Sequence, residues 1–194
     1  MLAILSIQEL FDMLMMTLFV GFIFKDSFMS GPSYGEMDPV EYYSRKSVKM
    51  LDGFFFAIIA TAPAIIFHEL GHKFVAEAFG MSAVFHAAYM WLGIGLLLKL
   101  INFGLIFFVP AFVSISGAGT YLQYALVAFA GPGINLILWI VSSMLLRMKK
   151  LDKKYIQILV MSKRINMFLF FFNMLPIPPF DGFSVFYNLF KVIF

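Results

Sequence analysis

The sequence predicts an all-α protein that crosses a membrane several times, and three observations indicate this fold. Of its 194 residues, 62% are apolar and only 13% are charged, whereas a soluble domain has about 25% charged residues. Apolar runs of about 20 residues, the length that crosses a bilayer, recur along the chain. The basic residues lie mainly between these runs. We therefore expect a multi-pass protein of a cell membrane, with about four to six membrane segments. We expect it to contact the lipid bilayer and not to bind nucleic acid.

The first part of the chain contains one apolar run followed by a polar stretch. We divide the sequence into residues 1–52, with a first transmembrane helix and a polar loop, and residues 53–194, which form the core. Residues 2–24 have the length of one membrane helix, although Glu9 and Asp12 interrupt the first half. The segment lacks the basic start and the small-residue cleavage site of a signal peptide, so we expect it to be a membrane helix.

Further helices follow from the alternation of polar and apolar stretches. The Gly, Pro and charged residues of 25–52 predict a loop outside the bilayer. Residues 53–79 predict a membrane helix that Pro63 is expected to kink. Two more apolar runs, 121–146 and 155–175, complete the predicted helices.

The segment 81–116 is apolar but does not fit a single clean pass. Gly, Asn and Pro interrupt it, and it closes with the β-branched residues of 113–115. Backbone that is neither helical nor part of a closed barrel is tolerated at membrane depth only against protein or a water-filled cavity. We therefore expect a re-entrant or short β element that lines a site. The depth of the neighbouring helices requires this segment to return to the side from which it entered, or to make an even number of short passes.

The string HELGH carries the clearest chemical signal. His68 and His72 lie four residues apart, on one face of a helix, so that both imidazoles can reach one metal ion while Glu69 reaches a water molecule. This arrangement is typical of zinc peptidases. Charged and titratable groups in a membrane helix cost about 2.5 to 3.5 kcal/mol each and usually indicate function.

A catalytic zinc ion needs a third protein ligand, and few residues can supply it. The chain has no Cys, and no Glu follows Glu77, which excludes the zinc peptidases whose third ligand is a distant Glu. The candidates are His86, Asp152 and Asp181. Asp152 lies among lysines, where a solvated ion pair is the expected role. Asp181 is favoured, because it follows prolines that open the last apolar helix.

Three motifs in order resemble those of the site-2 protease family of intramembrane zinc metalloproteases. They are HELGH at 68–72, AGPGIN at 130–135 and NMLPIPPFDG at 173–182. The resemblance covers the chain from about Gly53 onwards. It resembles a minimal form of the family, without the PDZ-like domain inserted between the second and third motifs and without the C-terminal regulatory domain.

The resemblance also implies a role for each matching residue. His68, His72 and Asp181 are expected to bind one Zn²⁺ per chain, and Glu69 is expected to be the general base. Asn173 is expected to lie beside the metal and to hold the substrate or the oxyanion.

Further candidates for substrate binding come from two other places. The strand-forming residues Val113, Ser114 and Ile115 could pair with the backbone of an unwound substrate, and a structureless connector is the alternative. Asn135 is a second candidate, and a polar contact between packed helices is its alternative.

The expected function is hydrolysis of peptide bonds within or near transmembrane segments of substrate proteins. One alternative is a membrane zinc carrier or a scaffold that binds transmembrane helices without cleaving them. A carrier would usually show internal repeats, and a scaffold is expected to lose Glu69 or a ligand; the sequence shows neither feature. A second enzymatic alternative places His86 as the third ligand.

Overall fold

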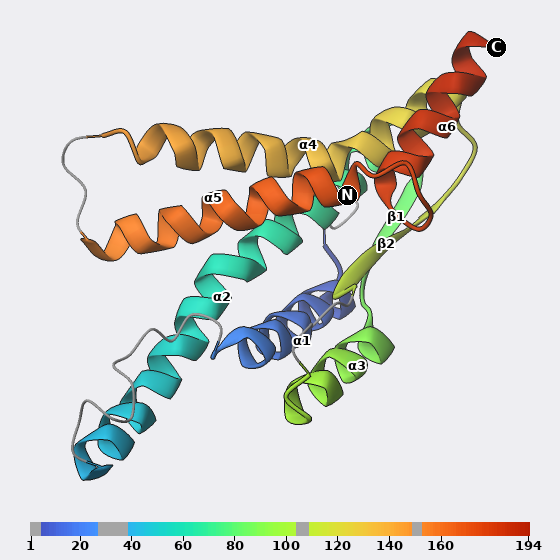
Figure 1. The fold of residues 1–194 in the computed structure, drawn as a ribbon. Helices are drawn as coiled ribbons and strands as arrows, with labels where there is room; N and C mark the ends of the chain where they lie inside the picture. Colours follow the sequence, from blue (N-terminus) through green and yellow to red (C-terminus); the bar gives the residue numbers. More distant parts are fainter. Residues whose placement is uncertain (1–4, 27–38, 104–108, 149–152) are drawn as a thin grey trace.

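The computed structural model describes residues 5–26, 39–103, 109–148 and 153–194. Long helices surround a small two-stranded sheet (Figure 1). In chain order the elements are α1 (Ile7–Phe24), α2 (Pro39–Ala78), β1 (Ser82–Ala87), α3 (Tyr89–Leu100), β2 (Ala111–Ser116), α4 (Tyr121–Leu145), α5 (Lys153–Asn173) and α6 (Asp181–Ile193).

Within the described residues, four helices are long and apolar enough to cross a membrane. These spans are Ile7–Phe24, Asp52–Ala78, Tyr121–Leu145 and Tyr155–Asn173. The expectation of a mostly helical membrane protein is confirmed. Pro63 lies inside α2, as predicted.

The predicted loop at 25–52 is wrong in its second half, because α2 already begins at Pro39. Pro is well suited to the first turn of a helix, where its missing N–H costs nothing, and the residues after it include good helix formers. The boundary drawn between residues 52 and 53 therefore falls inside α2. Residues 27–38 lie outside the described part of the chain.

The segment between α2 and α4 is a strand–helix–strand excursion. β1 and β2 are antiparallel, with Ser82 opposite Ser116 and Ala87 opposite Ala111, which confirms the expected short β element. The excursion therefore returns to the place where it began. Its middle part, α3, was not expected; at 12 residues it is about 18 Å long, too short to cross a bilayer.

The acids of α1 explain why this apolar helix contains charged groups. Glu9 accepts a hydrogen bond from the Phe85 backbone N–H at 2.9 Å and contacts the Lys73 ammonium at 2.8 Å. Asp12 accepts hydrogen bonds from the Ala87 N–H at 3.3 Å and from the Tyr89 hydroxyl at 2.6 Å. Both acids are buried. Helix α1 thus covers the edge of β1 that β2 leaves free.

An apolar cluster fixes the same contact between α1 and the excursion. Its buried members come from α1, β1, α3 and β2, and they are Met13, Met16, Val20, Phe85, Ala87, Leu92 and Ala111. Their burial removes apolar surface from both water and lipid and seats the sheet against α1 and α2.

Helix α4 runs antiparallel to α2 and also contacts α5 and α6 (Figure 1). Ala64 of α2 contacts Asn135, whereas His72, two turns later, contacts Val127, eight residues earlier in α4. A Cβ atom at Gly71 would lie 2.8 Å from the Ala130 carbonyl oxygen, so a side chain there would force α2 and α4 apart. The two motifs that contain Gly71 and Ala130 therefore meet at one helix interface.

Candidate metal centre

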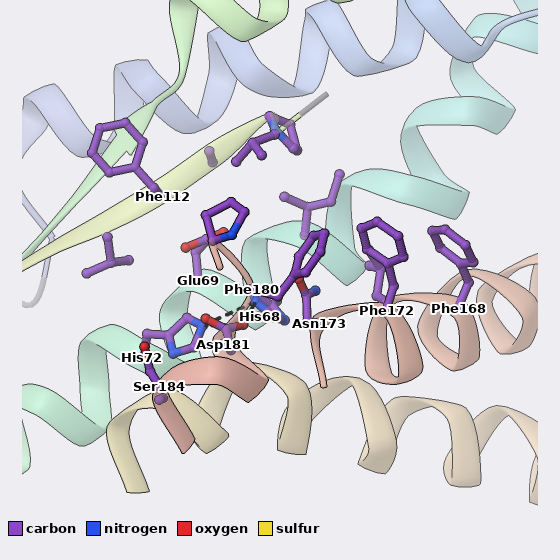
Figure 2. Close-up of a pocket in the computed structure, with 18 of the residues that line it drawn as sticks. His68, Glu69, His72, Phe112, Phe168, Phe172, Asn173, Phe180, Asp181 and Ser184 are labelled. Atoms are coloured by element: carbon purple, nitrogen blue, oxygen red, sulfur yellow. Dashed lines mark hydrogen bonds and ion pairs between the residues drawn. The ribbon is translucent and has the colours of Figure 1, made fainter. Parts of the chain in front are cut away.

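Three side chains from two distant parts of the chain converge at one point. His68 and His72 come from α2, and Asp181 is the first residue of α6 (Figure 2). The Oδ2 atom of Asp181 lies 3.2 Å from His68 Nε2 and 3.4 Å from His72 Nε2, and the two Nε2 atoms are 3.2 Å apart. Among the described residues, these three form the group that could hold a metal ion.

The spacing of these atoms fits zinc. Ligand atoms at about 2.0–2.2 Å from a tetrahedral ion lie about 3.3–3.6 Å from one another. The three measured separations, 3.2, 3.2 and 3.4 Å, are close to this range. Three protein ligands of the His and carboxylate type also leave the fourth position that a catalytic zinc ion needs.

The outer nitrogen of each imidazole has a defined partner. His68 Nδ1 lies 2.6 Å from Asn135 Oδ1, and His72 Nδ1 lies 2.8 Å from the Val127 carbonyl oxygen. The Asn135 amide nitrogen donates to the Ala64 carbonyl at 3.0 Å and to Asn166 Oδ1 at 2.9 Å, so its oxygen must face His68. Both Nδ1 atoms therefore carry the proton and both Nε2 lone pairs point at Asp181. Two lone pairs and a carboxylate that face one another favour a cation between them.

Glycines in the second and third motifs make room for this arrangement. A Cβ atom at Gly131 would lie 2.3 Å from His72 Nε2 and 2.8 Å from His68 Cε1. At Gly182 it would lie 2.4 Å from the Met174 backbone. A larger residue at either position would displace an imidazole or the turn that carries Asp181.

Asp181 is held in its ionised form at the start of α6. The N-terminal N–H groups of a helix favour a negative charge. The side chain is therefore a carboxylate at neutral pH, as a metal ligand must be.

Beside the three side chains lies a cavity of about 990 Å³ with mainly apolar walls. Glu69 and Asn173 both line it, together with the metal-centre residues (Figure 2). Glu69 is buried, and it lies one residue after His68 and three residues before His72 in α2. Asn173 is the last residue of α5, at the turn that leads to Asp181.

One edge of the sheet faces the same cavity. The N–H groups of Phe85 and Ala87 bond to α1, so these residues do not share backbone hydrogen bonds with β2. In an antiparallel pair, residues that share backbone hydrogen bonds with the partner strand alternate with residues that do not. Val113 and Ala111 lie opposite Phe85 and Ala87, so their backbone groups must point away from β1. By the same alternation Ile115 points outward, and both Val113 and Ile115 line the cavity.

The structure changes two of the sequence interpretations. Ser114 pairs with Val84 at a position where the backbone groups point towards β1, so Val113 and Ile115 carry the open edge without it. Asn135 was a candidate for substrate binding, with a polar contact between packed helices as the alternative; its side chain is fully buried and bonds to Ala64 and His68 of α2, which supports the alternative.

The rival third ligands are placed differently. His86 lies on β1, where its Nδ1 is 4.0 Å from Asp12 and its ring packs against Phe112, so it does not join the group of three. Asp152 lies outside the described residues.

Sequence reasoning missed two buried polar residues, one that supports Asn135 beside the metal centre and one that joins α2 to α1 and β1. Asn166 of α5 is buried; its amide donates to the Ser162 carbonyl, and its side-chain oxygen accepts from Asn135. Lys73 is buried against Glu9, Glu77 and the Ala83 carbonyl. Their signal is a polar residue inside an apolar helix, which is costly unless it has a partner.

Comparisons with known proteins agree with this geometry. The chain is 40% identical over 130 residues to a protein of Methanocaldococcus jannaschii named "Putative zinc metalloprotease MJ0611", and the match covers 66% of this chain and 68% of that protein. No family model and no solved structure matches the chain. The motifs, their convergence and this relative together show that the chain belongs to the site-2 protease-like family of zinc metalloproteases.

Proposed function

We propose that this protein is an intramembrane zinc endopeptidase of the cell membrane, which cleaves peptide bonds within or near the transmembrane segments of other proteins. One observation carries the proposal: a cavity between membrane-spanning helices contains the three metal-binding side chains, Glu69 and the outward edge of β2. The name of the relative supports the metalloprotease activity, and the cavity supports the choice of substrate.

His68, His72 and Asp181 would hold the zinc ion. When bound, zinc supplies Lewis acidity, which polarises the scissile carbonyl and lowers the pKa of water towards about 7. Glu69 accepts the proton of the attacking water and returns it to the nitrogen of the leaving amine. Asn173 binds the substrate carbonyl beside this centre.

The outward edge of β2 solves a problem specific to membrane substrates. A transmembrane helix must unwind before its peptide bonds become accessible, and its freed N–H and C=O groups then need partners inside the bilayer. Addition of the unwound segment as a strand beside β2 supplies these partners through Val113 and Ile115. The same pairing would hold the scissile bond next to Glu69.

The test compares Glu69→Gln with the wild type and with the matched control Glu77→Gln. Glu77 lies two turns further along α2, outside the cavity lining, and its side chain is partly exposed. We expect Glu69→Gln to retain one zinc ion and the fold but to lose cleavage of a transmembrane substrate, because Glu69 is a base and not a ligand. Glu77→Gln should retain both. Full turnover in Glu69→Gln would remove it from the mechanism, and zinc binding without any wild-type cleavage would favour a carrier or scaffold.

A further inference from the structure

Helix α5 places a basic side chain on the wall of the cavity. Its lining residues are Arg164, Ile165, Phe168, Leu169, Phe172 and Asn173. Their spacing along the helix defines one face, which begins with Arg164 and ends beside the metal centre with Asn173. Nine residues separate these two ends, a distance of about 14 Å at 1.5 Å per residue. All four residues between them on this face are apolar.

The contacts between helices place Arg164 deep in the membrane part of the molecule. Asn166 bonds to Asn135, which bonds to Ala64, so Arg164 lies near the level of the residues just before Ala64 in α2. Thr61 of α2 lines the same cavity and precedes His68 by seven residues, or about 10 Å. On both helices the cavity lining therefore extends for about two to two and a half turns from the metal centre, to the level of Arg164.

A guanidinium at this depth needs water or a negative partner. A charged side chain in the middle of a membrane helix is costly and usually faces a cavity or a counter-ion. The side chain of Arg164 is exposed, and the ion pairs formed among the described residues do not include it. The guanidinium therefore remains available to a group that enters the cavity.

We propose that Arg164 forms a carboxylate-binding subsite, which selects substrates with an acidic residue about four residues from the scissile bond. The proposal rests on the proposed function, because it assumes a peptide strand beside β2. Strand β2 extends along the cavity: Val113 packs against the apolar cluster that contains Val127, and Ala111 belongs to the cluster against which Ile65 packs. An added strand advances about 3.3 Å per residue, so 14 Å corresponds to about four residues. Arginine binds carboxylates through two parallel hydrogen bonds.

The test uses synthetic transmembrane peptides that carry Asp or Asn at the third, fourth or fifth position on either side of the cleaved bond. Cleavage sites are identified by mass spectrometry, and kcat/KM is measured for each pair. We expect the wild type to prefer Asp over Asn by about tenfold at one of these positions, as a charge-assisted hydrogen bond allows. In Arg164→Gln this ratio should fall to about one. Lys163→Gln, which removes the preceding charge outside the cavity lining, should keep the preference.

A charge exchange and a binding measurement make the result independent of turnover. Arg164→Glu should prefer a Lys peptide over the Asp peptide. The inactive Glu69→Gln protein should bind the Asp peptide about tenfold more tightly than the Asn peptide, and Glu69→Gln combined with Arg164→Gln should not. The binding result stands even if cleavage fails, so the two proposals can fail separately.

Two outcomes would overturn the subsite. One is an Asp preference that survives in Arg164→Gln, and the other is equal wild-type affinity for both peptides at every position. If the wild type shows no Asp preference but depends on phosphatidylglycerol in a way that Arg164→Gln does not, the guanidinium binds a lipid phosphate and no substrate carboxylate.

Discussion

The two edges of the small sheet have opposite surroundings. On the β1 edge, Glu9 and Asp12 accept the backbone N–H groups of Phe85 and Ala87, so α1 takes the place of a third strand. On the β2 edge, the outward backbone groups of Val113 face the cavity with the metal centre. An exposed strand edge is a template for any passing strand. The difference leaves the edge beside the candidate metal centre open to an added strand, whereas α1 covers the other edge.

The largest expected loss of stability comes from substitution of Glu9, which covers the β1 edge of the sheet. Glu9→Ala removes the buried partner of Lys73 and the acceptor of the Phe85 N–H. Breaking a buried ion pair on one side costs about 3–5 kcal/mol, so the free energy of unfolding in bicelles should fall by about this amount. Glu77→Ala removes the more exposed partner of the same lysine and should cost less than about 1 kcal/mol. Equal losses in the two variants would mean that Glu9 does not close the edge.

A smaller effect is expected further along the same edge. Asp12→Ala leaves the Ala87 N–H and the Tyr89 hydroxyl without their acceptor, which should lower the free energy of unfolding by about 1–3 kcal/mol. The control is Asp26→Ala, because Asp26 forms an exposed pair with Lys99, and its expected cost is about 0–1 kcal/mol. If Asp12→Ala is no worse than this control, the hydrogen bonds of Asp12 contribute little to the hairpin.

The smallest effect tests the open edge directly. A peptide substrate is N-methylated at one backbone nitrogen at a time, and kcat/KM is measured for each position. In a strand paired with β2, alternate residues point their N–H groups at Val113 and Ile115, so losses should appear at every second position. Each lost hydrogen bond of about 0.5–1.5 kcal/mol corresponds to roughly a twofold to twelvefold decrease. Uniform losses, or losses that repeat every three to four residues, would contradict strand addition.

Sequence patterns predicted most of the fold, because a helix that crosses a bilayer requires a long apolar run. The membrane helices follow from the length of the apolar runs, and the short β element follows from the irregular segment 81–116. Helix α3 and the first turns of α2 were missed. Local signals for a loop, such as the Pro that begins α2 at position 39, are also compatible with a helix start, and only tertiary packing separates the two.

The sequence also predicted some residues of the candidate site and missed the roles of others. The spacing of His68 and His72 is local, so the sequence alone predicts that both face one point. Asp181 could be selected because few acids are available. The role of Asn135 could not be read from the sequence, because its contact with His68 spans 67 residues of chain. The sequence also could not predict which of Val113, Ser114 and Ile115 point their backbone groups outward. This depends on which β1 residues donate hydrogen bonds to α1.

The proposed function requires that His68, His72 and Asp181 hold the metal beside the open edge of β2. It is tested most directly by the zinc content of the purified wild type, Asp181→Asn and His86→Ala, measured by plasma mass spectrometry after dialysis against a weak chelator. Loss of an outer partner typically lowers metal affinity by about 10–100-fold, and loss of a ligand should cost at least as much. We expect one zinc ion per chain in the wild type and in His86→Ala, and little zinc in Asp181→Asn. Equal zinc in Asp181→Asn and the wild type, or loss of zinc in His86→Ala, would contradict it.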